Sequence, residues 1–71
     1  MLRFAEKLRA LREQHKLSQR GLAKVFDMSQ SHLHLLETGQ RQPTVAFVVK
    51  VAQFFAVTPD HLLLDEVELP E

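Results

Sequence analysis

Apolar residues recur at helical spacing along most of the chain. Phe4, Leu8 and Leu11 follow one another at i, i+4 and i+7, with no proline or glycine in that segment. This pattern predicts a first amphipathic helix from about Arg3 to Lys16. Four further helical segments follow, and no segment has the pattern of a convincing strand. We therefore predict an all-α fold with five helices.

Two short helices separated by a tight turn are predicted next. Ser18 is a typical N-cap for the first of them. The apolar positions of that helix are Leu22, Ala23, Val25 and Phe26. Residues 27–28 form the turn, because aspartate accepts a left-handed backbone better than most residues. Ser29 caps the following helix, which ends near Thr38, and Gly39 terminates it as a C-cap glycine.

The third helix has a buried face and an outward face. Leu33 and Leu36 share the buried face with Ser29. The opposite face holds Gln30, Ser31, His34, Leu35 and Thr38. Two short helices that cross over a tight turn indicate a helix-turn-helix, whose second helix can enter the major groove of DNA. The outward face is therefore the candidate reading surface.

The fourth helix, which Thr44 caps after a polar connection over residues 40–43, indicates a partner. Its predicted inward face holds Val45, Val48, Ala52 and Phe55. Phe47 and Phe54 then lie on the outward face, and two exposed aromatic rings on a small domain mark an association surface. We predict a homodimer with an interface formed by Phe47, Phe54, Leu63 and Leu64. The alternative is that residues 64–71 fold back over the phenylalanines within one chain.

Length and composition set the broad class. A chain of 71 residues forms one domain with a limited core, and the lack of cysteine excludes disulfides and thiolate metal sites. The charged N-terminal segment lacks the continuous apolar run of a signal peptide, and Lys50 and Gln53 interrupt the most apolar segment. We therefore expect a soluble cytoplasmic protein with no membrane contact.

The formal net charge is zero, but its sign changes along the chain. Residues 1–41 hold eight basic and four acidic side chains, a net charge of +4, whereas residues 42–71 hold one basic and five acidic side chains, a net charge of −4. A polyanion such as DNA would therefore meet one end only. The alternative interpretation is that these charges belong to ordinary solvated helix faces.

The sequence contains no recognisable catalytic or metal site. His32 and His34 diverge because they lie two residues apart on a helix, and His15 and His61 are distant in sequence. No nucleophile elbow, glycine-rich phosphate loop or paired-carboxylate motif occurs. We expect no enzyme activity, no metal and no cofactor.

Several short motifs occur in a fixed order along the chain. They are Leu8-Arg9-Ala10-Leu11-Arg12, Leu17-Ser18-Gln19, Leu22-Ala23, Ser29-Gln30-Ser31, Leu36-Glu37-Thr38-Gly39, Arg41-Gln42-Pro43 and the segment 57–63. Over about residues 4–64 this set resembles the Cro and phage-repressor-like (XRE) helix-turn-helix domains. The resemblance implies a compact five-helix, lambda-repressor-like domain over residues 1–64. Residues 65–71 would then form a short acidic tail.

The resemblance also implies roles for individual residues. The implied base contacts are Gln30, Ser31, His34 and Leu35. The implied phosphate contacts are Ser18, Gln19, Arg20, Gln40 and Arg41. The resemblance further implies a partly buried ion pair between Arg12 and Glu37. Two positions depart from the family pattern. Leu35 stands where a polar or basic residue is common, and Asp27 replaces the usual turn glycine. The resemblance therefore implies neither the affinity for DNA nor the target sequence.

Two functions remain open on this basis. The first is a dimeric, sequence-specific transcriptional regulator that binds double-stranded DNA. The second is a protein-interaction module of the same fold, antitoxin-like or a component of a complex, in which Leu35, Phe47 and Phe54 bind another polypeptide. The charge distribution favours the first, and the exposed apolar residues favour the second.

Overall fold

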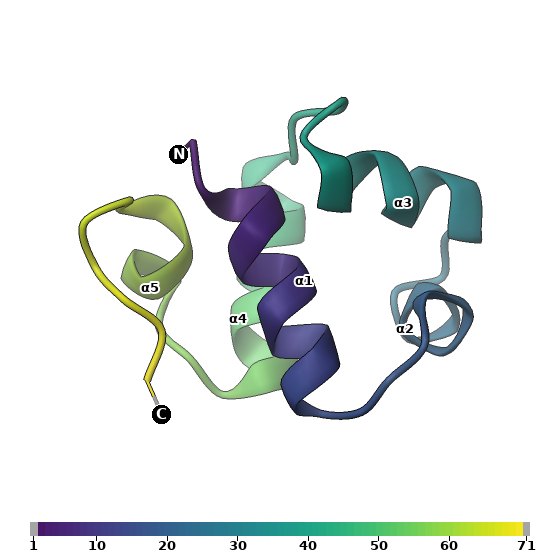
Figure 1. The fold of residues 1–71 in the computed structure, drawn as a ribbon, viewed down its shortest axis with the longest axis horizontal. Coiled ribbons are helices and arrows are strands. Elements are labelled where there is room, and N and C mark those ends of the chain that lie inside the picture. The colour runs from purple at the N-terminus through teal and green to yellow at the C-terminus, as the bar shows by residue number, and fades with distance from the viewer. Residues whose placement is uncertain (1, 71) are drawn as a thin grey trace.

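The computed structural model describes residues 2–70, which form five α-helices (Figure 1). They are α1 (Phe4–Gln14), α2 (Gln19–Val25), α3 (Gln30–Thr38), α4 (Val45–Phe55) and α5 (Pro59–Leu63). No residue in the described range adopts a strand, and the predicted all-α, five-helix fold is confirmed. α3 packs against α1 and α2 on one side of the molecule, while α5 packs against α1 and α4 on the other.

Hydroxyl side chains cap the N-termini of three helices, as predicted. Ser18 Oγ accepts a hydrogen bond from the backbone N–H of Gly21 at 2.9 Å, and Ser29 Oγ accepts one from the N–H of His32 at 3.1 Å. The hydroxyl of Thr44 does the same for α4. Each cap satisfies a backbone donor that has no partner within its helix. These three helix starts are therefore specified locally.

Left-handed backbone residues end several helices. Asp27, in the turn between α2 and α3, has a φ of 54°, and Gly39 ends α3 with a φ of 80°. Both conformations match the sequence-based expectation. Two others were not predicted: Lys16, with a φ of 56°, follows α1, which ends at Gln14, and Ala56, also at 56°, ends α4. Alanine in this region pays a steric cost that glycine avoids.

α4 is rotated about its axis relative to the prediction. Its buried face consists of Phe47, Val48, Val51, Ala52 and Phe55. Phe47 is only 8% exposed, and its ring lies edge-on to the rings of Phe4 and Phe26, at centroid distances of 6.2 and 5.2 Å. Val45 is 74% exposed. The predictions of an outward Phe47 and an inward Val45 are therefore wrong.

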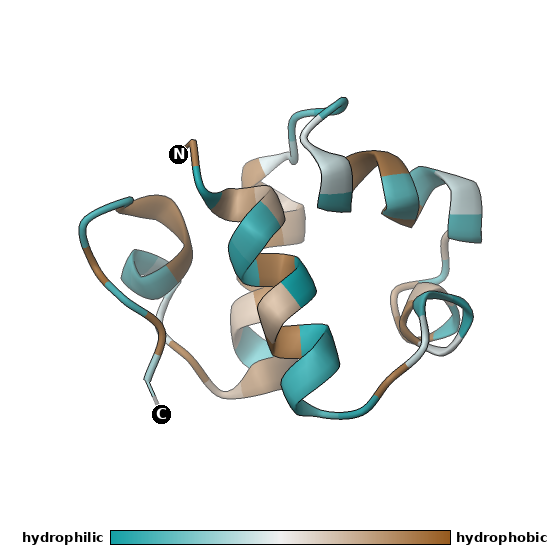
Figure 2. Ribbon diagram, in the orientation of Figure 1, coloured by the Kyte–Doolittle hydropathy of each residue, from teal (hydrophilic) through white to brown (hydrophobic). Residues whose placement is uncertain are grey.

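The cause of this rotation lies in the composition of α4. Figure 2 shows polar and apolar residues interspersed along α1 and α3, whereas the ribbon of α4 is apolar over most of its length. Lys50 and Gln53 are the only polar residues in α4. With so few polar positions, hydrophobic periodicity defines the buried side poorly. Packing against Phe4 and Phe26 decides it instead.

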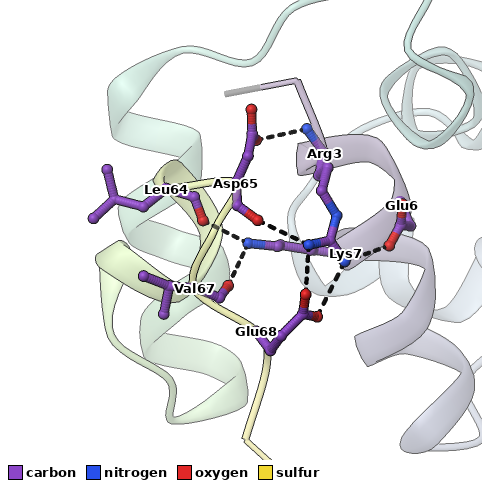
Figure 3. A network of polar contacts seen from close by, with 7 residues as sticks. All are labelled: Arg3, Glu6, Lys7, Leu64, Asp65, Val67 and Glu68. Atoms are coloured by element: carbon purple, nitrogen blue, oxygen red, sulfur yellow. Dashed lines mark hydrogen bonds and ion pairs between the residues drawn. The ribbon is translucent and has the colours of Figure 1, made fainter.

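The C-terminal segment, residues 64–70, folds back on the start of α1 (Figure 3). The Asp65 carboxylate accepts hydrogen bonds from the backbone N–H groups of Leu2 and Arg3, at 3.0 and 2.9 Å. Buried Lys7 donates from Nζ to the carbonyl oxygens of Leu64 and Val67, at 2.8 and 2.6 Å. The segment therefore packs within one chain, on the start of α1. The alternative interpretation expected it to cover the phenylalanines of α4 instead.

An acidic cluster surrounds the Arg3 guanidinium in the same region. Arg3 Nη1 donates to Glu68 Oε1 at 2.7 Å, and Nη2 donates to Glu6 Oε2 at 2.8 Å. The hydrogen bonds from Arg3 lower the pKa of Glu68 and of Glu6. The pKa of Asp65 is lowered by the backbone N–H of Arg3 and then by that of Leu2. Glu68 of the C-terminal segment therefore neutralises Arg3, the residue that precedes α1.

Candidate nucleic-acid interface

The outward face of α3 is open to solvent as predicted. Gln30, Ser31 and His34 are exposed, and Leu35 is half-buried. Together with Gln19 at the start of α2, these four residues line an open hollow of about 420 Å³. Among residues 2–70, the side chains of Gln30 and Ser31 make no hydrogen bond, so their polar groups are available to an external partner.

A buried ion pair fixes the opposite side of α3 to α1. Arg12 Nε donates to Glu37 Oε2 at 2.8 Å, and Arg12 Nη1 donates to the carbonyl oxygen of Leu17 at 2.9 Å. The Glu37 side chain is 1% exposed and that of Arg12 is 14% exposed. Leu33 and Leu36 are buried on the same side of the helix. The orientation of the exposed face is therefore set by buried contacts, as the resemblance implied for the ion pair.

Gln19 connects this ion pair to the exposed face, which the sequence did not predict. Its amide nitrogen Nε2 lies 3.2 Å from Glu37 Oε1 and 3.3 Å from His34 Nδ1. Gln19 is the first residue of α2, and His34 and Glu37 lie one turn apart on α3. A chain of polar contacts thus leads from α1 through α2 to the outward face of α3.

A family model described as a helix-turn-helix domain matches residues 3–64. The chain belongs to this helix-turn-helix family. Searches of curated proteins and of solved structures returned no significant match. The match agrees with the resemblance to XRE-type domains, and membership of the family indicates DNA binding.

The remaining predicted contact residues of the helix-turn-helix domain lie at two places. Ser18 and Arg20 are exposed and flank Gln19 at the start of α2. Gln40 and Arg41 are exposed in the connection between α3 and α4, and Gln40 Nε2 donates to the Thr38 hydroxyl at 2.9 Å. Arg41 borders a separate hollow of about 300 Å³. The predicted contact residues thus flank the exposed face at both ends of the motif.

In the folded chain, the basic residues among the first 41 positions fall into two groups. Arg3, Lys7 and Arg12 are held in contacts within the domain. The other five are exposed and form no ion pair with an acidic side chain in the described range: Arg9, Lys16, Arg20, Lys24 and Arg41. Fewer basic side chains are therefore available to a polyanion than the count along the sequence indicated. The basic residues next to the C-terminal segment are not among them.

The predicted dimer residues are dispersed. Phe47 is buried, and Leu63 is half-buried and packs against the core. Phe54 and Leu64 remain 45% and 42% exposed, on α4 and just after α5. The Phe54 ring lies 5.7 Å from that of Phe26, which shields one of its sides. Of the four residues, only Phe54 and Leu64 offer substantial apolar surface.

The histidines outside α3 make local contacts in the helix-turn-helix domain. His15 Nδ1 lies 2.9 Å from the carbonyl oxygen of Leu11, and His61 Nδ1 accepts a hydrogen bond from the N–H of Thr58 at 3.1 Å. The described part of the chain contains no cluster of three side chains suited to bind a metal ion. Likewise, none of its helices has the length and apolar character required to cross a membrane.

Proposed function

We propose that this domain is a sequence-specific transcriptional regulator that inserts α3 into the major groove of an operator. The observation that carries the proposal is the exposure of Gln30, Ser31 and His34 on a helix whose other side is fixed by Arg12 and Glu37. A rigid helix with exposed polar side chains can align hydrogen-bond donors and acceptors with base edges.

The exposed residues of α3 suit distinct base contacts. The Gln30 amide can pair with N6 and N7 of adenine, and the Ser31 hydroxyl can donate to or accept from several bases. His34 offers a further polar contact. Leu35, which is half-buried beside them, suits the methyl group of thymine. We assign sequence preference to these four residues.

Residues on either side of α3 suit the phosphate backbone. Ser18, Gln19 and Arg20 lie at the start of α2, and Gln40 and Arg41 follow α3. Contacts from these positions would fix the register of α3 in the groove without selecting a sequence. The two arginines would also release counterions, which makes binding dependent on salt.

A homodimer would present two copies of α3 to half-sites about 34 Å apart, one turn of DNA. Phe54 and Leu64 supply the exposed apolar surface that supports this part of the proposal. Light scattering on the wild type and on Phe54→Ser tests it. We expect a dimer that dissociates in the variant, and a strictly monomeric wild type at high concentration refutes dimerisation.

The DNA-binding experiment compares two single variants over a series of salt concentrations, on duplexes selected from a random pool. Arg41→Ala should weaken binding to all duplexes. It should also reduce the slope of log affinity against log salt concentration by about one, because one phosphate contact is lost. Gln30→Ala should instead relax the preference at particular base pairs. Gln53→Ala removes an exposed glutamine from α4 and serves as the matched control for Gln30→Ala.

A protein-interaction module is the second candidate function, and one observation favours it. Val25 and Phe54 are both about half exposed and line one open hollow with Asp27 and Lys50. Such a surface suits another polypeptide. If the wild type binds no duplex at low salt, this second function replaces the first.

A further inference from the structure

We infer that Gln19 is a positioning residue that fixes the tautomer of His34, so that His34 presents an N–H donor to DNA. The inference rests on the proposed function and adds a rule about which base edges His34 can read. It also removes the Gln19 amide from the set of phosphate donors.

Glu37 decides which end of the Gln19 amide faces it. One carboxylate oxygen of Glu37 accepts from Arg12 Nε at 2.8 Å, and the other lies 3.2 Å from the Gln19 amide. A carboxylate paired with arginine only accepts hydrogen bonds, so the amide must present its NH₂ group. The reverse orientation would set the carbonyl oxygen of Gln19 against a buried negative charge.

The same NH₂ group then decides the tautomer of His34. Gln19 Nε2 lies 3.3 Å from His34 Nδ1, and an amide nitrogen donates hydrogen bonds but does not accept them. His34 Nδ1 must therefore be the acceptor and carry no proton. In a neutral imidazole the proton then resides on Nε2. Arg12, Glu37, Gln19 and His34 form a relay that starts at a partly buried guanidinium and ends at the exposed face.

The relay has two consequences for recognition. With a proton on Nε2, His34 can donate to acceptors in the major groove, such as N7 or O6 of guanine, but it cannot accept from the amino group of cytosine. Both amide protons of Gln19 are used within the protein, so only its carbonyl oxygen remains, and that oxygen cannot donate to a phosphate. The phosphate contacts then fall to Ser18, Arg20, Gln40 and Arg41.

The first test measures the tautomer in the free chain. Long-range ¹H–¹⁵N correlation spectra are recorded at about pH 8.5, two units above the ordinary histidine pKa of about 6.5. We expect the Nε2–H form at His34 in the wild type, and a shift in Gln19→Ala toward the tautomer ratio of His32, whose side chain makes no hydrogen bond within residues 2–70. Gln40→Ala should leave the His34 signal unchanged.

His15 provides an internal reference of opposite sign. Its Nδ1 lies 2.9 Å from a carbonyl oxygen, which only accepts, so His15 should show the Nδ1–H form in the same spectrum. This signal establishes that the two forms are resolved. A His34 signal that does not change in Gln19→Ala overturns the inference.

The second test is a double-mutant cycle on DNA. Gln19→Ala and His34→Ala should each lose about two- to tenfold of the preference at one base pair, and the double variant should lose no more than either. A uniform loss over all sequences in Gln19→Ala, independent of His34, overturns the inference and supports a phosphate contact. A wild type that binds no duplex refutes the proposed function, and the spectra then decide the relay alone.

Discussion

Replacing Arg12 with alanine tests the anchor of α3. Glu37 has a side chain that is 1% exposed, and Arg12 provides its only cationic partner among the described residues. Loss of one partner from a buried ion pair costs about 3–5 kcal/mol, because the remaining charge is left without compensation. The Arg12 side chain is 14% exposed, so some water can reach the site, and we expect a cost of about 3 kcal/mol.

This cost is large for a chain of 71 residues. At roughly 0.05–0.15 kcal/mol per residue, the free energy of unfolding is about 4–11 kcal/mol. For domains of this size, 1 kcal/mol shifts Tm by about 4–8 °C, so Arg12→Ala should lower Tm by about 12–24 °C. Thermal and urea unfolding followed by circular dichroism at 222 nm measures the change.

Two variants control the measurement. Arg9→Ala removes the same charge from an exposed position of α1 and should change stability by less than about 0.5 kcal/mol. Arg12→Met combined with Glu37→Leu replaces both charges by apolar groups of similar size and should recover most of the loss. Equal, small shifts for Arg12→Ala and Arg9→Ala would contradict the argument that the pair anchors α3.

Further predictions concern the C-terminal segment, α4 and the end of α4. Hydrogen bonds lower the pKa of Asp65 and Glu68 in the folded state, so the stability that they contribute is complete above their ordinary pKa values of 3.8 and 4.5 and is lost as the pH falls through the lowered values. Asp65→Asn should therefore reduce the acid dependence of urea unfolding. An unchanged profile would contradict the contact of Asp65 with the backbone N–H groups of Leu2 and Arg3. Phe47→Ala should lower the free energy of unfolding by about 3–5 kcal/mol and Phe54→Ala by clearly less, since only Phe47 is buried. Similar losses for the two variants in chemical denaturation would contradict this difference in burial. Ala56→Gly should raise stability by up to about 1 kcal/mol, because glycine relieves the left-handed backbone at a φ of 56°; a lower Tm in the variant would argue against that conformation.

Much of the fold and part of the candidate site followed from the sequence, because the signals are local. A serine cap bonds a backbone N–H three residues away, as at Ser18 and Ser29, and Gly39 ends α3 through its own backbone conformation. The outward face of α3 follows from helical periodicity about Leu33 and Leu36. These features need no knowledge of the rest of the chain.

Tertiary structure alone decided the features that depend on distant partners. α4 is apolar on most of its faces, so only packing against Phe4 and Phe26 determines that Phe47 is buried and Val45 is exposed. Asp65 reaches the N–H of Arg3 across 62 positions of sequence, which no local pattern records. Gln19 contacts His34 and Glu37 only because the turn brings α2 across α3. Sequence therefore determined where the helices begin and which face of α3 is polar, and folding determined how that face is held and which atoms it presents.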